Sequence, residues 1–293
     1  MKVSRLAPCK VNLLLTILGK RLDGFHELET LLYPIPIHDE LEIERSGVGI
    51  SLECDAVGIP RDPTNLSWKA AEAFRARVGA FDGVRIRLVK HLPVSAGLGG
   101  GSSDAAHTLL GLNELFGFPL SREDLTLLAS KLGSDVPFFL DGLPAIGVGR
   151  GEIVTPQTSL NALEGAAIVL CYPSFGVSTA WAYKALARFP ASLSGVAGGA
   201  AALVTALRDR PLPEALSLMH NSLEPPVFEK YPLIQLAVET MRREGAVGSL
   251  MSGSGSTAFG ICSSLAAGER LGELMKREFG RHAWVATASI PKC

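Results

Sequence analysis

Residues 93–106 read Pro93-Val-Ser-Ala-Gly-Leu-Gly-Gly-Gly-Ser-Ser-Asp-Ala-Ala106. In the preceding residues 84–89, apolar and basic residues alternate as in a half-buried strand, and residues 105–116 carry apolar side chains at helical spacing. Glycines between a strand and a helix let backbone N–H groups approach an anion closely, and the helix N-terminus adds a positive dipole. The stretch therefore predicts a loop that binds a phosphate chain, with a flexible connection as the alternative.

Other nucleotide and catalytic motifs do not fit the chain. The Walker pattern needs a lysine before the hydroxyl residue, and the loop has none. The dinucleotide pattern begins at Gly97 and Gly99 but meets Ser102 at its sixth place, which argues against a Rossmann oxidoreductase. A GxSxG elbow, typical of α/β-hydrolases, does not occur.

Composition indicates a compact protein that does not bind nucleic acid through a broad basic surface. Of the 293 residues, 47% are hydrophobic and 19% charged, which excludes intrinsic disorder. The 28 basic and 29 acidic side chains leave a net charge of -1, so no broad basic field for nucleic acid is expected. The five cysteines are scattered and form no CxxC pair, so neither a zinc site nor a disulfide framework is expected.

We expect a cytoplasmic protein without a membrane partner. The first ten residues, MKVSRLAPCK, lack the long apolar stretch of a signal peptide. Residues 189–207 contain no charge, but Pro190 and several glycines interrupt them. A loop leading into a helix over residues 200–207 is therefore expected here.

Strands and helices alternate without a regular βα rhythm, which favours an α+β fold. Thr64 is expected to be the N-cap of a helix that runs to Gly79, and Ser121 that of a helix that runs to Leu132. Strands are expected at 11–18, 41–43, 84–89 and 167–172, and further helices at 179–187, 232–243 and 266–278. A change of composition near residues 155–163 suggests two domains, 1–158 and 159–293.

Five further segments carry a family resemblance together with the glycine loop. They are Ala7-Pro-Cys-Lys-Val-Asn-Leu13, Arg21-Leu-Asp-Gly-Phe-His-Glu-Leu28, Pro63-Thr-Asn-Leu66, Gly133-Ser-Asp-Val-Pro-Phe-Phe139 and Met251-Ser-Gly-Ser-Gly-Ser256. In this order they resemble the motifs of the GHMP kinases, named after galactokinase, homoserine, mevalonate and phosphomevalonate kinases. Asp-Gly-Phe-His-Glu and the triple glycine resemble the branch that acts on the cytidine diphosphate ester of methylerythritol.

The resemblance implies a two-domain fold with an ATP-binding N-terminal domain and an active site in the cleft between the domains. It implies transfer of phosphate from Mg-ATP to the 2-hydroxyl of the cytidyl substrate, in the non-mevalonate isoprenoid pathway. Cys9 stands where the family has a small residue. Phe25 replaces a tyrosine, which keeps a ring for stacking but removes a hydroxyl.

Asp135 and Lys10 are the predicted catalytic pair. Asp135 precedes Val-Pro, and Pro137 suits the first turn of a helix, so spacing alone leaves base and helix cap equally open. The resemblance favours the base. A cation at Lys10 would keep the carboxylate ionised and stabilise charge in the transition state. Whether Asp135 accepts the proton or orients the hydroxyl stays open.

Substrate contacts are expected from residues in both halves of the chain. The predicted set is Asn12, Phe25, His26, Thr179 and Tyr183. A neutral imidazole suits the polar edge of cytosine, and Phe25 and Tyr183 would stack on its faces, with Phe175 as the runner-up for the second ring. By resemblance, residues 252–256 face the substrate; a plain turn between strands is the alternative.

The resemblance assigns ATP to the glycine loop and to the start of the first long helix. The predicted contacts are Pro93, Val94, Ser95, Ala96, Gly97, Leu98, Gly99, Gly100, Gly101, Ser102 and Ser103, with Asn65 and Leu66 at the adenine pocket. Mg²⁺ would bridge the outer phosphates, without assigned protein ligands. A sister kinase for another small alcohol and a catalytically silent ATP sensor stay open as alternatives.

Overall fold

The computed structural model describes residues 1–79 and 82–291 and has a mixed α+β architecture, as expected. The chain forms two compact units. The first unit comprises Met1–Cys9, Ile37–Leu92 and Gly99–Gly142, and the second comprises Lys10–Pro36, Pro93–Leu98 and Leu143–Cys293. The predicted boundary at 158/159 stays a prediction.

Two long strands, β1 (Lys2–Lys20) and β2 (His26–Arg45), contribute to both units. The expected turn at Asp23–Gly24 joins them. The first part of β1 alternates between buried and exposed side chains, whereas Cys9–Ile17 is buried throughout. Continuous burial indicates that this part of the strand is covered on both faces.

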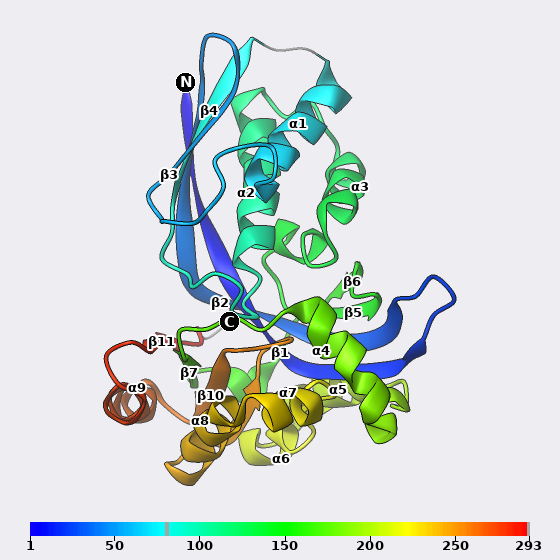
Figure 1. Cartoon of the computed structure of the whole chain (residues 1–293), viewed down its shortest axis with the longest axis vertical. Coiled ribbons are helices and arrows are strands. Elements are labelled where there is room, and N and C mark those ends of the chain that lie inside the picture. Colours follow the sequence, from blue (N-terminus) through cyan, green and yellow to red (C-terminus); the bar gives the residue numbers. More distant parts are fainter. Residues whose placement is uncertain (80–81, 292–293) are drawn as a thin grey trace. The chain divides into compact units, whose positions relative to one another are not determined.

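In the first unit, the second half of β2 pairs antiparallel with β4 (Gly83–Val89), which pairs parallel with β3 (Gly49–Cys54). The alternation predicted for residues 84–89 is confirmed, because Val84, Ile86 and Leu88 are buried and the arginines between them are exposed. The helices of this unit are α1 (Leu66–Val78), α2 (Gly100–Leu115), α3 (Arg122–Leu132) and the 3-10 helix η1 (Pro137–Leu140). Of the three long helices, α1 contacts β3, α2 packs on α1, and α3 packs on α1 and α2 (Figure 1).

Capping explains where the first of these helices begins, and it corrects one expectation. Asn65, not Thr64, is the N-cap of α1, and its Oδ1 accepts the Ser67 N–H at 2.8 Å. Thr64 instead donates its backbone N–H and its hydroxyl to Asp62. Because Thr64 is hydrogen-bonded within the turn at Asp62, the next residue, Asn65, becomes the N-cap of α1. The expected cap at Ser121 is confirmed, since it accepts the Asp124 N–H.

The second unit has an antiparallel sheet in the order β11-β7-β10-β9. Its strands are β7 (Ala167–Tyr172), β9 (Gly248–Met251), β10 (Ala258–Cys262) and β11 (Trp284–Ser289). Two helices, α8 (Pro232–Arg243) and α9 (Leu265–Phe279), pack on this sheet (Figure 1). Val238 and Met241 of α8 meet Val169 of β7 in the core. The expected strand at 167–172 and helix at 232–243 are confirmed.

The rest of this unit consists of shorter elements. They are β5 (Ala145–Gly149), β6 (Ile153–Pro156), β8 (His220–Asn221), α4 (Thr179–Ala185), α5 (Gly199–Asp209), α6 (Leu212–Leu216), α7 (Glu224–Lys230), η2 (Asn161–Leu163), η3 (Leu186–Arg188) and η4 (Pro190–Leu193). The uncharged stretch 189–207 forms a loop with η4 and the start of α5, as expected. Within residues 1–79 and 82–291, no helix has the length and apolar character needed to cross a membrane.

A buried ion cluster ties the start of α2 to the sheet of the first unit. The ammonium of Lys90 lies 2.7 Å from Asp104 Oδ2 and also contacts Asp39, which is fully buried. Asp39 in turn accepts the backbone N–H groups of His91 and Leu92. Burial raises the pKa of Asp104 to about 7; the charge of Lys90 partly offsets this rise, and the neighbouring Asp39 adds to it.

Asp104→Asn tests this cluster through its pH dependence. The pKa of Asp104 in the folded state lies above its ordinary value of 3.8. Its contribution to stability is therefore complete below pH 3.8 and is lost as the pH rises through about 7. The unfolding free energy of the wild type should therefore fall, relative to that of Asp104→Asn, between pH 5 and pH 8 in urea titrations. Asp124→Asn is the control, because its pKa is lowered. Parallel profiles for wild type and Asp104→Asn would contradict the assignment.

Candidate functional site

The glycine loop has a fixed left-handed backbone at three alternating positions. Ser95, Gly97 and Gly99 have φ of 54°, 80° and 71°. Gly99 is the N-cap of α2 and makes no side-chain capping bond, and its carbonyl accepts the first intrahelical bond, from Ser103 at 2.9 Å. The N–H groups of residues 100–102 consequently have no acceptor within the helix. This is the geometry of an anion site at a helix N-terminus.

Hydrogen bonds hold the part of the loop that belongs to the second unit. Three successive carbonyl oxygens act as acceptors: Ala96 from Thr257 N at 3.1 Å, Gly97 from Ser252 Oγ at 2.9 Å and Leu98 from Lys10 N at 3.0 Å. The loop is therefore a structured segment and not a plain flexible connection.

Gly97 and the segment Ser252–Ser256 touch backbone to backbone. A Cβ at Gly97 would stand 2.2 Å from the Ser252 carbonyl oxygen, which excludes any side chain. A Cβ at Gly253 would lie 3.3 Å from the Gly97 oxygen and 3.4 Å from Lys10 Nζ. Ser252–Ser256 joins β9 to β10, so it is a turn between strands that also packs against the loop and Lys10.

Lys10 lies buried on β1 and is held by a polar chain. Its Nζ donates to Asn12 Oδ1 at 2.7 Å, Asn12 Nδ2 donates to Thr30 Oγ1 at 2.8 Å, and Thr30 donates to the Leu14 carbonyl at 2.6 Å. Each of these residues is at most 3% exposed. Asn12 therefore orients Lys10; its predicted contact with substrate stays a prediction.

Asn221 is a positioning residue that sequence reasoning missed. It is buried on β8, and its Nδ2 donates to the carbonyls of Met251 and Gly253, both at 2.8 Å. Its Oδ1 accepts the Leu223 N–H. The surrounding residues His220-Asn-Ser222 match no motif. A single asparagine of this kind gives no sequence signal of its role.

The predicted substrate residues of the second unit form an aromatic pair and an exposed ring. The His26 and Tyr183 ring centroids are 5.3 Å apart, tilted by 39°. Burial and the nearby Lys20 charge hold the pKa of His26 below its ordinary value, so the imidazole is neutral at pH 7. Phe25 is 54% exposed in the turn before β2.

Thr179 and Phe175 have different surroundings. Thr179, the first residue of α4, lies 2.9 Å from the Ser254 hydroxyl and so joins the segment Ser252–Ser256. Phe175 stacks on Tyr231 at 5.5 Å within the hydrophobic core. Tyr183 packs against the same core cluster as Phe175, so the choice of Tyr183 over Phe175 for the second ring stays a prediction.

In the first unit, Asp135 lies in the turn between α3 and η1, and η1 packs against α2. Val136 occupies the N-cap position of η1, so the alternative role of Asp135 as that cap is wrong. The Asp135 side chain is half-buried.

The adenine-side residues also lie in the first unit. Leu66 begins α1 and approaches Gly101 of α2, since a Cβ there would lie 3.7 Å from its Cδ1. Asn65 uses both ends of its amide, capping α1 and donating to the Pro60 carbonyl at 2.8 Å. Ser103 is fully buried beside His107. Their predicted contacts with ATP stay predictions, as do the cleft and the contacts of Pro93, Val94 and the other loop residues.

Metal-binding residues are not clustered. Among residues 1–79 and 82–291, no group of three or more His, Cys, Asp or Glu side chains is placed to hold a metal ion. A Mg²⁺ ion that arrives on ATP phosphates and keeps its waters needs no such group.

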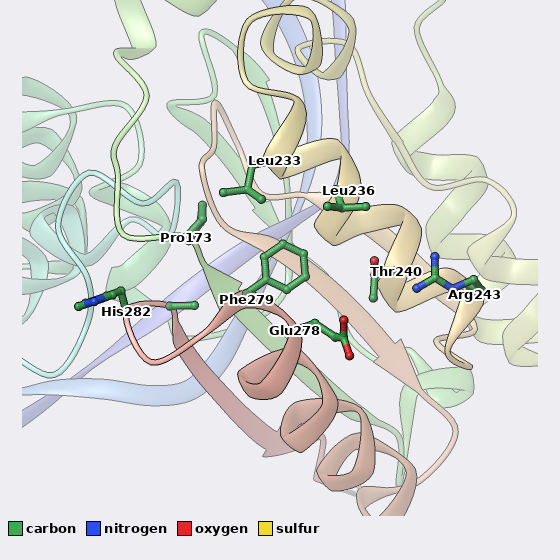
Figure 2. Close-up of a pocket in the computed structure, with 9 residues that line it drawn as sticks. Pro173, Leu233, Leu236, Thr240, Arg243, Glu278, Phe279 and His282 are labelled. Carbon is green, nitrogen blue, oxygen red and sulfur yellow. The ribbon is translucent and has the colours of Figure 1, made fainter.

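The second unit also has a hollow of about 240 Å³ beside α8 (Figure 2). Its lining consists of Pro173, Leu233, Leu236, Thr240, Arg243, Glu278, Phe279, His282 and Ala283. None of the residues predicted from the sequence is among them, so this hollow is separate from the candidate site.

Comparison with known proteins establishes the family. The description "GHMP kinases N terminal domain" matches residues 65–142, and "GHMP kinases C terminal" matches residues 200–281. A protein of Geobacter sp. (strain M21) named 4-diphosphocytidyl-2-C-methyl-D-erythritol kinase is 41% identical over 261 residues, 89% of either chain. A protein of the same name from Synechococcus sp. (strain JA-2-3B'a(2-13)) is 40% identical over 94% of this chain and 89% of its own.

Solved structures agree. A crystal structure of 4-(cytidine 5'-diphospho)-2C-methyl-D-erythritol kinase superposes with a TM-score of 0.81 at 37% identity, covering 98% of this chain and all of that chain. Homoserine kinase from Cytophaga hutchinsonii shares the fold at 20% identity, with a TM-score of 0.73 over 99% of this chain and 95% of its own. The predicted resemblance is thus confirmed: the chain belongs to the family of 4-diphosphocytidyl-2-C-methyl-D-erythritol kinases, within the GHMP kinases.

Proposed function

We propose that the chain transfers the γ-phosphoryl group of Mg-ATP to the 2-hydroxyl of 4-diphosphocytidyl-2-C-methyl-D-erythritol and releases ADP. The reaction belongs to the non-mevalonate isoprenoid pathway. The observation that carries the proposal is the meeting of three distant motifs at Lys10: β1, the glycine loop and the segment Ser252–Ser256. The relatives described above carry this activity in their names.

The glycine loop and the start of α2 would bind the ATP phosphates. The N–H groups of residues 100–102 point out of the helix end and are suited to phosphate oxygens, as is the hydroxyl of Ser102. Leu66 beside Gly101 supplies an apolar contact that suits adenine. Mg²⁺, bound to the same phosphates, would neutralise their charge.

Lys10 and Asp135 would activate the acceptor. The carbon at position 2 carries a methyl group, so its hydroxyl is a crowded tertiary alcohol and depends strongly on alignment. Asp135 would accept the hydroxyl proton while the oxygen attacks the γ-phosphorus and the bond to ADP breaks. Lys10, oriented by Asn12, would stabilise the charge on the transferred group.

His26 and the rings near it would recognise cytosine. Cytosine presents an amino donor and two acceptors, and a neutral imidazole offers one donor and one acceptor. The lowered pKa of His26 favours that neutral form. Phe25 and Tyr183 would stack on the base.

A substrate panel separates this function from its rivals. Purified protein with Mg-ATP should release ADP with the cytidyl substrate and not with homoserine, mevalonate or galactose. Release with one of those alcohols alone would favour a sister kinase. ATP binding without turnover of any would favour the sensor.

Asp135→Asn should lower turnover by roughly 10²–10⁴-fold, the usual contribution of acid–base help, and leave the Kd for ATP nearly unchanged. Steady-state kinetics and nucleotide titration measure the two effects. Asp141→Asn, at the other end of η1, is the matched control. Near-normal turnover of Asp135→Asn would contradict its role.

His26→Ala should raise the Kd of the cytidyl substrate about tenfold or more and that of ATP little, because the imidazole faces only the base. Calorimetric titration of each ligand measures both constants, with His91→Ala, which alters an exposed histidine, as the control. Equal losses for both ligands would show that His26 is structural.

Gly97→Ala should displace the loop and weaken ATP binding, because its Cβ would collide with the Ser252 carbonyl. Gly117→Ala has the same φ of 80° but open space, so it isolates the backbone strain. We expect Gly97→Ala to lose about 1–3 kcal/mol more stability than this control. Equal thermal shifts and intact ATP affinity would refute the close contact.

A further inference from the structure

Phe25 occupies a turn whose backbone is tightly held. The Arg21 N–H donates to the Phe25 carbonyl at 2.8 Å, and the Phe25 N–H donates to Asp23 Oδ1 at 3.1 Å. Arg21 itself pairs with Asp23 at 3.1 Å. These bonds fix the backbone but leave the 54% exposed ring without restraint about its own side-chain torsions.

Arg150 supplies the contact that the ring lacks. It follows β5, which pairs with β2 (Figure 1). Because Gly149 of β5 pairs with Leu28 of β2, the strand register brings Arg150 towards the turn before β2. The centre of its guanidinium lies 4.8 Å from the Phe25 ring centroid, within the range of a cation–π contact. One face of the ring is therefore covered by a cation.

Arg150 is in turn held by Glu152. The Glu152 carboxylate accepts the Arg150 backbone N–H at 2.6 Å and its Nε–H at 3.4 Å. With its Nε bonded to Glu152, Arg150 keeps its flat guanidinium over the Phe25 ring. Glu152, Arg150 and Phe25 thus form a chain of contacts that ends on an exposed aromatic surface.

We propose that Arg150, braced by Glu152, is a positioning residue that fixes the Phe25 ring so that its open face receives a pyrimidine base. The proposal rests on the function proposed above and extends it to a residue outside the family motifs. An orientation set before binding lowers the entropy lost when the base stacks. Because Phe25 has no hydroxyl to anchor it, its orientation depends on the contact with Arg150.

Cytidine and CDP distinguish positioning from direct contact with phosphate. Arg150→Met removes the cation and keeps the side-chain length. It should raise the Kd of both probes by the same factor, about threefold to fivefold, because the base is common to them. A loss with CDP but not with cytidine would overturn the proposal in favour of a phosphate contact.

Arg188→Met is the matched control, since Arg188 also covers a phenylalanine, Phe189 at 5.6 Å, and pairs with Glu229 at 2.7 Å. It should leave both constants unchanged. In a Phe25→Leu background, Arg150→Met should cause no further loss, because the ring through which it acts is gone. An additional loss there would also overturn the proposal.

Binding of cytidine and CDP by the wild type distinguishes a failure of the role proposed for Arg150 from a failure of the proposed function. If the wild type binds cytidine and Arg150→Met binds it equally well, the role of Arg150 is wrong and the proposed function stands. If the wild type binds neither cytidine nor CDP, the proposed substrate is wrong, and the inference falls with it.

Discussion

The backbones of Gly97 and Ser252 lie so close that no side chain fits between them. This contact joins a loop near the first third of the chain to a turn near its end, and Ser252 Oγ strengthens it by donating to the Gly97 carbonyl. Asn221 also holds this turn, by donating to the carbonyls of Met251 and Gly253. The loop continues directly into α2, whose N-cap is Gly99.

The polar residues of β1 follow from the same arrangement. A strand that is covered on both faces normally carries only apolar side chains, yet Lys10 and Asn12 lie buried on it. A buried ammonium is costly unless it has polar partners, and Asn12 and Thr30 form such a chain. The structure thus keeps a cation at the loop in one orientation.

Much of the fold could be predicted from periodicity. β7 and α8 were expected at their observed bounds, because a short continuous apolar run and an apolar helical stripe are strong local patterns. The expected N-cap of α1 was wrong by one residue, because Thr64 and Asn65 are both good N-cap residues and only the hydrogen bonds of Thr64 to Asp62 decide between them. Local rules could not show that competition.

Candidate site residues could be named from the sequence where they occur in motifs, and not where a single side chain acts from a distance. The glycine loop, Lys10 and His26 all belong to motifs. Asn221 and Arg150 do not, and their positions depend on strand pairings, β8 with β1 and β5 with β2, that join segments far apart in sequence. Long-range register of this kind leaves little trace in one sequence.

The identity of the phosphorylated oxygen decides whether the chain is a kinase for the 2-hydroxyl of the cytidyl substrate. Proton-coupled phosphorus NMR of the product, made with Mg-ATP and the cytidyl substrate, reports on the carbon that bears the new phosphate. Carbon 2 carries a methyl group and no hydrogen, so the account predicts a new monoester signal without three-bond coupling to hydrogen. A coupled monoester signal, or inorganic phosphate alone, would contradict it.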